Sequence, residues 1–260
     1  MNINRTILIT NDDGIHAKGI AALIEMVRPF GTITVVAPKE PQSGMSGAVT
    51  IVTPIRLFEY KREEGVIYYV CTGTPVDCVK IAMSELFVDR MPDLLVSGVN
   101  HGSNASSAVL YSGTLGAAAE GVLYGIPSIG FSLDTTHDPN ADFSASVVFG
   151  RKILEQYFRH PPSPNVYLNI NIPDLPQEEI KGIRMARQGK GAWIKEFEKR
   201  IDPHGYPYYW LTGEFRNDEP DAPDTDKNLL DLGYITIVPH QVDSTHYAEM
   251  ERLQQNWEIT

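Results

Sequence analysis

The chain has 260 residues, 42% of them hydrophobic, and a formal net charge of −11. This length suits one large α/β domain or a core with an appendage. The acidic balance disfavours binding to nucleic-acid polymers, which requires a basic surface. No apolar run is long enough to span a bilayer, and the N-terminus lacks the layout of a signal peptide. Cys71 and Cys78 form no CxxC pattern, so we expect buried free thiols and a cytoplasmic location.

The first half of the chain alternates strand-like and helix-like segments. Apolar, β-branched runs predict strands at residues 6–10, 32–37, 93–97 and 127–131, and a hairpin at 56–60 and 66–71. Helices are predicted at residues 17–28 and 113–124, and a further one begins at Thr74-Pro75, where Thr is a good N-cap and Pro suits the first helical position. This βαβ rhythm predicts an α/β fold with a mostly parallel sheet and helices on both faces.

The pattern changes in the second half. A helix at 143–159 and a strand at 166–172 continue the alternation, but residues 183–216 are rich in Tyr, Trp, Gly and Lys. Residues 217–231 are acidic and contain Pro, which predicts a surface loop, and a strand at 234–238 and a polar C-terminal helix follow. We therefore predict a catalytic core over residues 1–182. A smaller C-terminal α+β region over residues 183–260 is expected to carry a hairpin and an oligomerisation arm.

The run Asn11-Asp12-Asp13-Gly14 directly follows the first buried strand. Open α/β folds bind ligands at the carboxyl ends of parallel strands. Two adjacent carboxylates repel each other unless a cation lies between them, and Gly14 permits the turn that would bring them together. Oxygen ligands favour a hard ion such as Mg²⁺, Mn²⁺ or Ca²⁺. The alternative is an N-terminal helix cap beside a solvated acid.

A second feature is the glycine- and serine-rich segment 97–114, which should lie on the same sheet edge. Ser112 precedes a helix, so the amides of Gly113 and Thr114 would form an anion site at its N-terminus. No Lys or Arg lies between Ser97 and Ala117, so a phosphate there would need positive charge from elsewhere. A cation site beside an anion site predicts metal-assisted phosphoryl chemistry, although Gly/Ser loops are also ordinary turns.

Several common nucleotide and hydrolase motifs are missing. The chain has no GxGxxG after its first strand, no GxxxxGK[ST] and no Gly-x-Ser-x-Gly elbow. Dinucleotide-dependent and P-loop functions therefore lose their main support.

The chain resembles the SurE family of survival proteins, which are metal-dependent 5′-nucleotidases. The matching segments are ILITNDDGIHAKGI (7–20), VVAPKEPQSGMSGAVT (35–50), TGTPVDCV (72–79), LLVSGVNHGSN (94–104), YSGTLGAAAEG (111–121) and NINIP (169–173). The resemblance implies a Rossmann-like core and a C-terminal part that exchanges a segment between subunits, giving dimers or tetramers. One departure is Val238-Pro239-His240, where family members commonly carry Thr-Pro-Leu.

The resemblance also implies the site residues. The family's metal ligands fall on Asp12, Asp13, Ser43 and Asn100, and its phosphate-contacting positions fall on Asn104, Ser112, Gly113 and Thr114, with Gly44 close by. The implied reaction is hydrolysis of nucleoside 5′-monophosphates to nucleoside and phosphate. Some members also accept 3′-nucleotides or polyphosphate.

As a mechanism we expect one Mg²⁺ or Mn²⁺ per subunit and attack on phosphorus by metal-activated water, with Asp12 or Asp13 taking its proton. The alternative is nucleophilic attack by Ser112, for which no activating base is evident. We expect His101 to face solvent as a loop residue. The base pocket could be lined by 72–77 and Tyr111, and residues 206–210 could either cover the site or pack as a hairpin.

Other functions remain open from the sequence. These are a phosphatase of non-nucleotide phosphomonoesters, a non-catalytic nucleotide-binding stress module, and a transferase that uses a nucleotide-sugar. Metal-dependent phosphate release separates an enzyme from a binding module, and a panel of nucleotides separates a nucleotidase from a general phosphatase.

Overall fold

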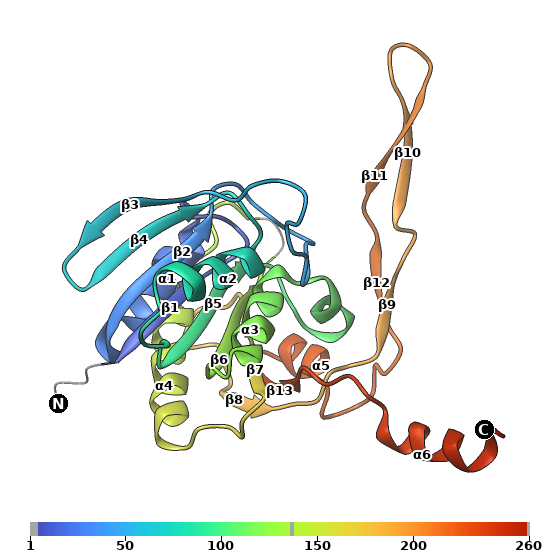
Figure 1. Cartoon of the computed structure of the whole chain (residues 1–260). Helices are drawn as coiled ribbons and strands as arrows, with labels where there is room; N and C mark the ends of the chain where they lie inside the picture. Colours follow the sequence, from blue (N-terminus) through green and yellow to red (C-terminus); the bar gives the residue numbers. More distant parts are fainter. Residues whose placement is uncertain (1–4, 136–137, 259–260) are drawn as a thin grey trace.

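The computed structural model describes residues 5–135 and 138–258. Its centre is a nine-stranded sheet in the order β3-β4-β2-β1-β5-β6-β7-β13-β8 (Figure 1). These strands are β1 (Thr6–Thr10), β2 (Thr32–Pro38), β3 (Leu57–Glu63), β4 (Val66–Cys71), β5 (Leu94–His101), β6 (Ser128–Asp134), β7 (Val166–Pro173), β8 (Ile183–Met185) and β13 (Ile235–Gln241). In the sheet order from β4 to β7, all neighbouring strands run parallel. The strand β3 runs antiparallel to β4, and β13 runs antiparallel to β7. The predicted α/β fold with a mostly parallel sheet is confirmed.

The central strand β1 is buried on both faces. Ile7 and Ile9 pack in one apolar cluster with Leu23 and Leu154, and Leu8 packs in a second cluster on the other face. A strand covered on both sides has no polar face, which explains why this segment is a continuous apolar run rather than an alternating one.

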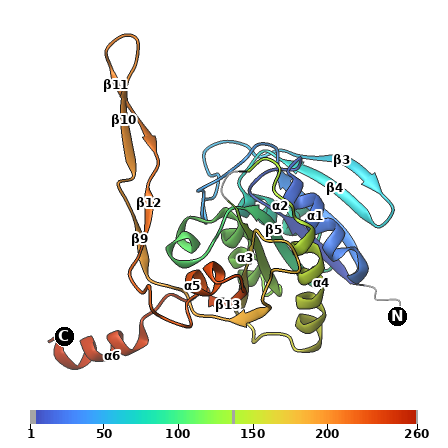
Figure 2. The same ribbon diagram turned by 180° about the vertical axis from the view of Figure 1, so that it is seen from behind.

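Helices cover both faces of the sheet, as predicted (Figures 1 and 2). One cluster includes side chains of α1 (Lys18–Val27) and α4 (Ser144–Arg159), and the other includes side chains of α2 (Pro75–Glu85) and α3 (Gly113–Leu123). The Thr74 cap is present as a reciprocal pair: Asp77 N donates to Thr74 Oγ1 at 3.1 Å, and Thr74 N donates to Asp77 Oδ2 at 2.9 Å. Within the described residues, no helix is both long and apolar enough to cross a membrane.

Two short helices differ from the sequence prediction. The segment after β5 contains the 3₁₀ helix η2 (Ser106–Tyr111), and the stretch predicted as a surface loop ends in α5 (Asp226–Asp231). Thr225 caps α5 by accepting from Asn228 N, and Asp226 is fully buried. The loop prediction is therefore wrong for residues 226–231. The acidic composition of this segment does not reveal that one of its carboxylates, that of Asp226, is buried in the folded protein.

A long two-stranded ribbon stands away from the sheet (Figures 1 and 2). Its base pairs β9 (Gly191–Ile194) with β12 (Glu214–Asn217), and its outer part pairs β10 (Phe197–Ile201) with β11 (Pro207–Leu211). The helix α6 (Tyr247–Asn256) also projects and has no buried residue. Because β8 and β13 join the central sheet, the segment after residue 182 both extends the sheet and forms the ribbon. The domain boundary at residue 182 stays a prediction.

One face of the outer ribbon is mostly apolar and is interrupted by Lys199, which lies opposite Tyr209. Residues directly opposite in an antiparallel pair share a face, and the register places Phe197 opposite Leu211 and Ile201 opposite Pro207. Phe197 and Leu211 are 67% and 69% exposed, so this face is open to solvent in the single chain. Exposed apolar surface of this kind indicates an interaction surface.

Candidate active site

The predicted site loops meet at one edge of the sheet, beyond the carboxyl ends of β1, β2 and β5. A cavity of about 250 Å³ lies there, and six of the predicted site residues line it: Asp12, Ser43, Gly44, Asn100, Asn104 and Ser112. His101, Tyr111 and Trp193 line the same cavity. The structure therefore brings together residues from the loops after β1 and β2, from the end of β5 and the segment that follows it, and one residue from the ribbon.

Asp12 is the more buried of the two acids, with 4% of its surface exposed. Its Oδ1 accepts a hydrogen bond of 2.6 Å from Thr114 Oγ1, so the Thr114 hydroxyl is engaged with Asp12. A Cβ atom on Gly113 would lie 2.9 Å from the Asp12 Cβ, so only glycine fits there without a shift. The Asp12 carbonyl accepts from Gln42 N at 2.7 Å, which holds the loop that carries Ser43.

Asp13, the second acid after β1, does not line the cavity that Asp12 lines. Its Oδ2 accepts a hydrogen bond of 3.1 Å from His101 N, and it lines a separate cavity of about 230 Å³ with Lys18 and Phe143. His101 lines both cavities, and its Nε2 lies 2.8 Å from the Asp138 carbonyl oxygen. His101 therefore lies between the two cavities and is not a freely solvated loop residue.

The two carboxylates carry charge that the surrounding protein does not balance. Burial, followed by repulsion from Asp13, raises the pKa of Asp12 to about 6, while the Thr114 hydrogen bond acts against the rise. Burial also raises the pKa of Asp13. Neither acid takes part in an ion pair within the described part of the chain. A bound cation would remove this cost of burying charge.

The donor set at this edge fits a hard cation. Among the described residues, no group of three or more His, Cys, Asp or Glu side chains is placed to bind a metal ion. An ion held by Asp12 and Asp13 would therefore take its further ligands from neutral oxygens. Asn100 Nδ2 donates to the Gly102 carbonyl at 2.7 Å, which leaves Asn100 Oδ1 as its free acceptor. Ser43 is exposed on its loop. Two carboxylates with neutral oxygens suit Mg²⁺ or Mn²⁺ and do not suit a soft metal.

The anion side of the site is the N-terminus of α3. Ser112 is the N-cap, and its Oγ accepts from Leu115 N at 3.1 Å, so its hydroxyl proton is available for another acceptor. The first amides of a helix lack partners within the helix, which leaves those of Gly113 and Thr114 as donors. The donors lie beside Asp12, so a phosphate bound here would be next to the cation.

Asn104 is held by buried polar residues that sequence reasoning did not assign. Its Nδ2 donates to Ser132 Oγ at 2.8 Å, its N donates to Asn171 Oδ1 at 2.8 Å, and its carbonyl accepts from Asn169 Nδ2 at 2.9 Å. Both asparagines are fully buried on β7. Their signal in the sequence is the spacing of two, which places two polar side chains on one face of an apolar strand.

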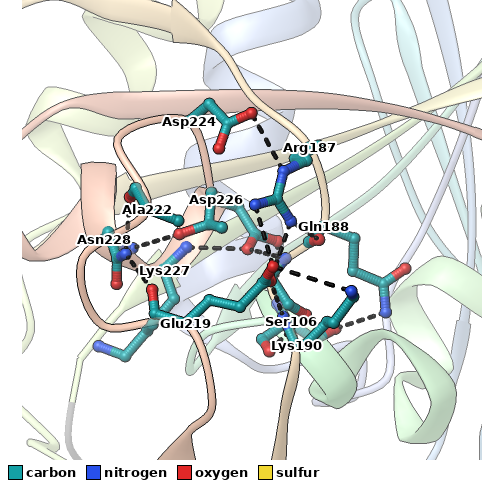
Figure 3. Close-up of polar contacts among 12 residues, drawn as sticks. Ser106, Arg187, Gln188, Lys190, Glu219, Ala222, Asp224, Asp226, Lys227 and Asn228 are labelled. Carbon is teal, nitrogen blue, oxygen red and sulfur yellow. Dashed lines mark hydrogen bonds and ion pairs between the residues drawn. The ribbon is translucent and has the colours of Figure 1, made fainter.

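A second polar network ties η2 to the base of the ribbon (Figure 3). Asp226 accepts from Ser106 N at 2.9 Å through Oδ2, and from Gly189 N and Lys227 N, both at 2.8 Å, through Oδ1. Ser106 Oγ donates to the Gly189 carbonyl at 2.8 Å. The buried carboxylate therefore fixes the turn between Asn104 and Ser112 against the C-terminal region.

Outside the network, Arg187 donates to the exposed Asp224 and to Glu219 (Figure 3). Residues 206–210 lie at the end of the outer turn and in β11 and do not line the candidate cavity beside Asp12. Trp193, at the ribbon base, lines it instead. No pattern in the sequence identifies Trp193, because its place depends on how the ribbon leaves the core.

Comparisons with known proteins relate the chain to one family. The family model described as "Survival protein SurE" matches residues 7–195. A protein of Phocaeicola vulgatus named 5′-nucleotidase SurE is 47% identical over 97% of this chain and 96% of its own length. The protein of the same name from Flavobacterium johnsoniae is 47% identical with the same coverage. The crystal structure of the SurE protein from Aquifex aeolicus aligns with a TM-score of 0.82 and 35% identity, covering 96% of this chain and 98% of that one.

Proposed function

Because the chain belongs to the SurE family, we propose that it is a divalent-metal-dependent 5′-nucleotidase that releases phosphate from nucleoside 5′-monophosphates. The observation that carries the proposal is the uncompensated carboxylate of Asp12 beside the N-terminus of α3. The raised pKa marks a buried carboxylate that a cation would stabilise, and the uncharged donors can bind a phosphate. The two sites lie side by side.

Asp12, Asp13, Ser43 and Asn100 would hold the ion, either Mg²⁺ or Mn²⁺. When bound, the ion supplies Lewis acidity to the phosphoryl oxygens and lowers the pKa of water at the site. The chain's own residues do the rest. Ser112 and the amides of Gly113 and Thr114 bind the phosphoryl oxygens and stabilise the negative charge that develops on them.

Other residues keep these groups in position. Thr114 orients the Asp12 carboxylate, and Asn169 and Asn171 fix Asn104. Gly44 lines the cavity on the loop that carries Ser43 and lets that loop turn with a positive φ of 76°. One of the two aspartates takes the proton of the attacking water, and the leaving nucleoside oxygen takes a proton from solvent.

We also propose that the protein self-associates and acts in the cytoplasm. The apolar face of the ribbon supports self-association as a dimer or tetramer, which would cover it. Two buried free cysteines support action in the cytoplasm, where thiols stay reduced. Hydrolysis of 3′-nucleotides or polyphosphate at the same site remains part of the proposal, because the phosphate donors do not depend on the rest of the substrate.

The test is phosphate release from a panel of substrates with Mn²⁺, with Mg²⁺ and with EDTA. The panel contains 5′-AMP, 3′-AMP, polyphosphate, ribose 5-phosphate and an aryl phosphate. We expect release that needs the metal and is fastest with 5′-AMP. Binding of nucleotide without release would support a non-catalytic module, and equal rates on all monoesters would support a general phosphatase.

A further inference from the structure

A second cavity adjoins the catalytic one at the base of the ribbon. It has a volume of about 450 Å³ and is lined by Tyr111, Trp193, Glu196, Leu211, Thr212 and Gly213. Tyr111 and Trp193 also line the catalytic cavity. Two aromatic side chains therefore stand where the two cavities meet, one from the end of η2 and one from β9.

Both aromatic residues are fixed at one side and open at the other. The Trp193 ring meets Phe215, its cross-strand partner, edge to face at a centroid distance of 5.8 Å and an angle of 68°. Trp193 is nevertheless 41% exposed, and Tyr111 is 56% exposed. The Tyr111 carbonyl accepts from Ser46 N at 3.1 Å, which anchors its backbone beside the loop of Ser43. Exposed aromatic surface beside a polar cavity offers stacking area to a ligand.

The position of this aromatic surface matches the shape of a nucleotide. Tyr111 is followed directly by Ser112, the N-cap at the phosphate side of the site. A ligand whose phosphate reaches Ser112 would extend its other end past Tyr111 toward Trp193. The second cavity is mostly apolar apart from Glu196 and Thr212, so a planar ring suits it better than a free sugar or a second charge.

We infer that Tyr111 and Trp193 form the nucleobase subsite, and that they select nucleotides over phosphomonoesters that lack a base. This inference rests on the proposed 5′-nucleotidase activity. Every base has a π face, so stacking on these rings tolerates both purines and pyrimidines. The subsite therefore sets the class of substrate and leaves the identity of the base open.

The two walls of the subsite are joined by one buried carboxylate. Asp226 accepts from Ser106 N at the start of the turn that ends at Tyr111, and from Gly189 N just before the strand that carries Trp193. Both contacts lie in the buried network of Figure 3. The spacing of the rings thus depends on the folded core and not on the outer ribbon, which makes the slot preformed.

The experiment measures kcat/KM for 5′-AMP and for ribose 5-phosphate with Mn²⁺ in the intact protein and in Trp193→Ala. We expect the ratio of the two values to fall about tenfold or more in the variant, since a stacked base loses this much when an aromatic partner becomes alanine. Trp193→Phe should recover most of the ratio. Trp210→Ala is the matched control, because Trp210 lies on the ribbon and does not line either cavity.

The outcomes separate the two levels of the proposal. An intact protein that hydrolyses neither substrate with metal would overturn the nucleotidase proposal itself. An intact protein that hydrolyses both, with the same ratio in Trp193→Ala, would overturn the base subsite alone. An equal loss of ratio in Trp210→Ala would also overturn it, because the effect would then belong to the ribbon as a whole.

Discussion

Thr114 Oγ1 donates a 2.6 Å hydrogen bond to Asp12 Oδ1, although 102 positions separate the two residues in the chain. The contact is possible because β1 and β5 are adjacent, and because α3 begins at the sheet edge where β1 ends. The bond stabilises the charged form of Asp12 against the cost of burial. It also connects the cation side of the site to the helix that would bind phosphate.

Thr114→Val should weaken Mn²⁺ binding by about tenfold or more, since a hydrogen bond to a charged group is worth roughly 1.5–3 kcal/mol. The side chain keeps its shape, and Asp12 loses the donor that lowers its pKa. Isothermal titration at neutral pH measures the affinity. Thr236→Val is the matched control, because the buried Thr236 hydroxyl has no hydrogen-bond partner in the described structure. Equal affinities in both variants would show that the Asp12 contact is not used.

The affinity for Mn²⁺ should rise with pH through about 6. Burial raises the pKa of Asp12 to about 6, and a divalent cation binds the carboxylate only after the proton has left. Below this pH the proton competes, so affinity falls, whereas above it affinity levels off. Titrations between about pH 5 and about pH 8 test the expectation. An affinity that is flat across this range would contradict a protonated Asp12 in the metal-free protein.

The same pKa fixes the sign of a stability effect in the metal-free protein. Folded Asp12 holds its proton more tightly than the unfolded chain does, so its contribution to the free energy of unfolding falls as pH rises from about 4 to about 6. The free energy of unfolding of Asp12→Asn should therefore rise relative to that of the intact protein across this window, by at most about 3 kcal/mol. Denaturant unfolding in EDTA measures the difference. A gap between the two proteins that does not grow with pH would argue against the raised pKa.

Asp13→Asn should keep the fold and lose most of the turnover, by about 100-fold or more. The variant retains a side chain that accepts from His101 N but lacks the second negative charge for the ion and one candidate base. Excess Mn²⁺ should not restore the rate. Steady-state kinetics and circular dichroism follow activity and fold separately, and near-normal turnover would remove Asp13 from the site.

Much of the fold could be predicted because burial leaves a direct mark in the sequence. The run Ile7–Ile9 is apolar throughout because both faces of β1 are covered, and a polar pair directly after it marks the ligand edge of the sheet. Asp12 and Asp13 could be predicted from their position after a buried strand, and residues 112–114 from their position at the start of a helix. Ser43, Gly44, Asn100 and Asn104 came only from the resemblance to the SurE family. Their association with a metal and a phosphate stays a prediction.

Other features could not be predicted, because they depend on contacts between distant segments. Asp226 looks like one more residue of an acidic, Pro-containing stretch, yet it is fully buried and accepts from an amide 120 positions away. Trp193 lies in an aromatic-rich segment in which only the register of the ribbon decides which rings face the core. Local composition describes the neighbours of a residue in sequence, and both roles are set by neighbours in space.

Asp226→Asn should destabilise the protein by about 1–3 kcal/mol. The asparagine NH₂ group would replace one of the two carboxylate oxygens, and a donor would then face a backbone N–H donor. The loosened turn should also raise KM for 5′-AMP. Denaturant midpoints and steady-state kinetics measure the two effects. The matched control is Asp224→Asn, which removes an exposed charge paired with Arg187 and should change stability by less than about 1 kcal/mol. Equal effects in both variants would contradict the anchoring role.

If the chain self-associates through the apolar face of the outer ribbon, as we propose, Ile201→Glu should leave single chains of 28.9 kDa. Ile201 and Tyr209 lie on the mostly apolar face of the outer ribbon, and a carboxylate at position 201 would lose its hydration in any assembly that covers this face, with Lys199 as the charged neighbour on the same face. Tyr208→Glu is the control, because Tyr208 pairs with Arg200 on the opposite face of the same strands. Sedimentation analysis gives the mass of each variant. If Tyr208→Glu dissociates the protein and Ile201→Glu does not, the subunits meet through the other face of the ribbon, and the exposed apolar face needs a different partner.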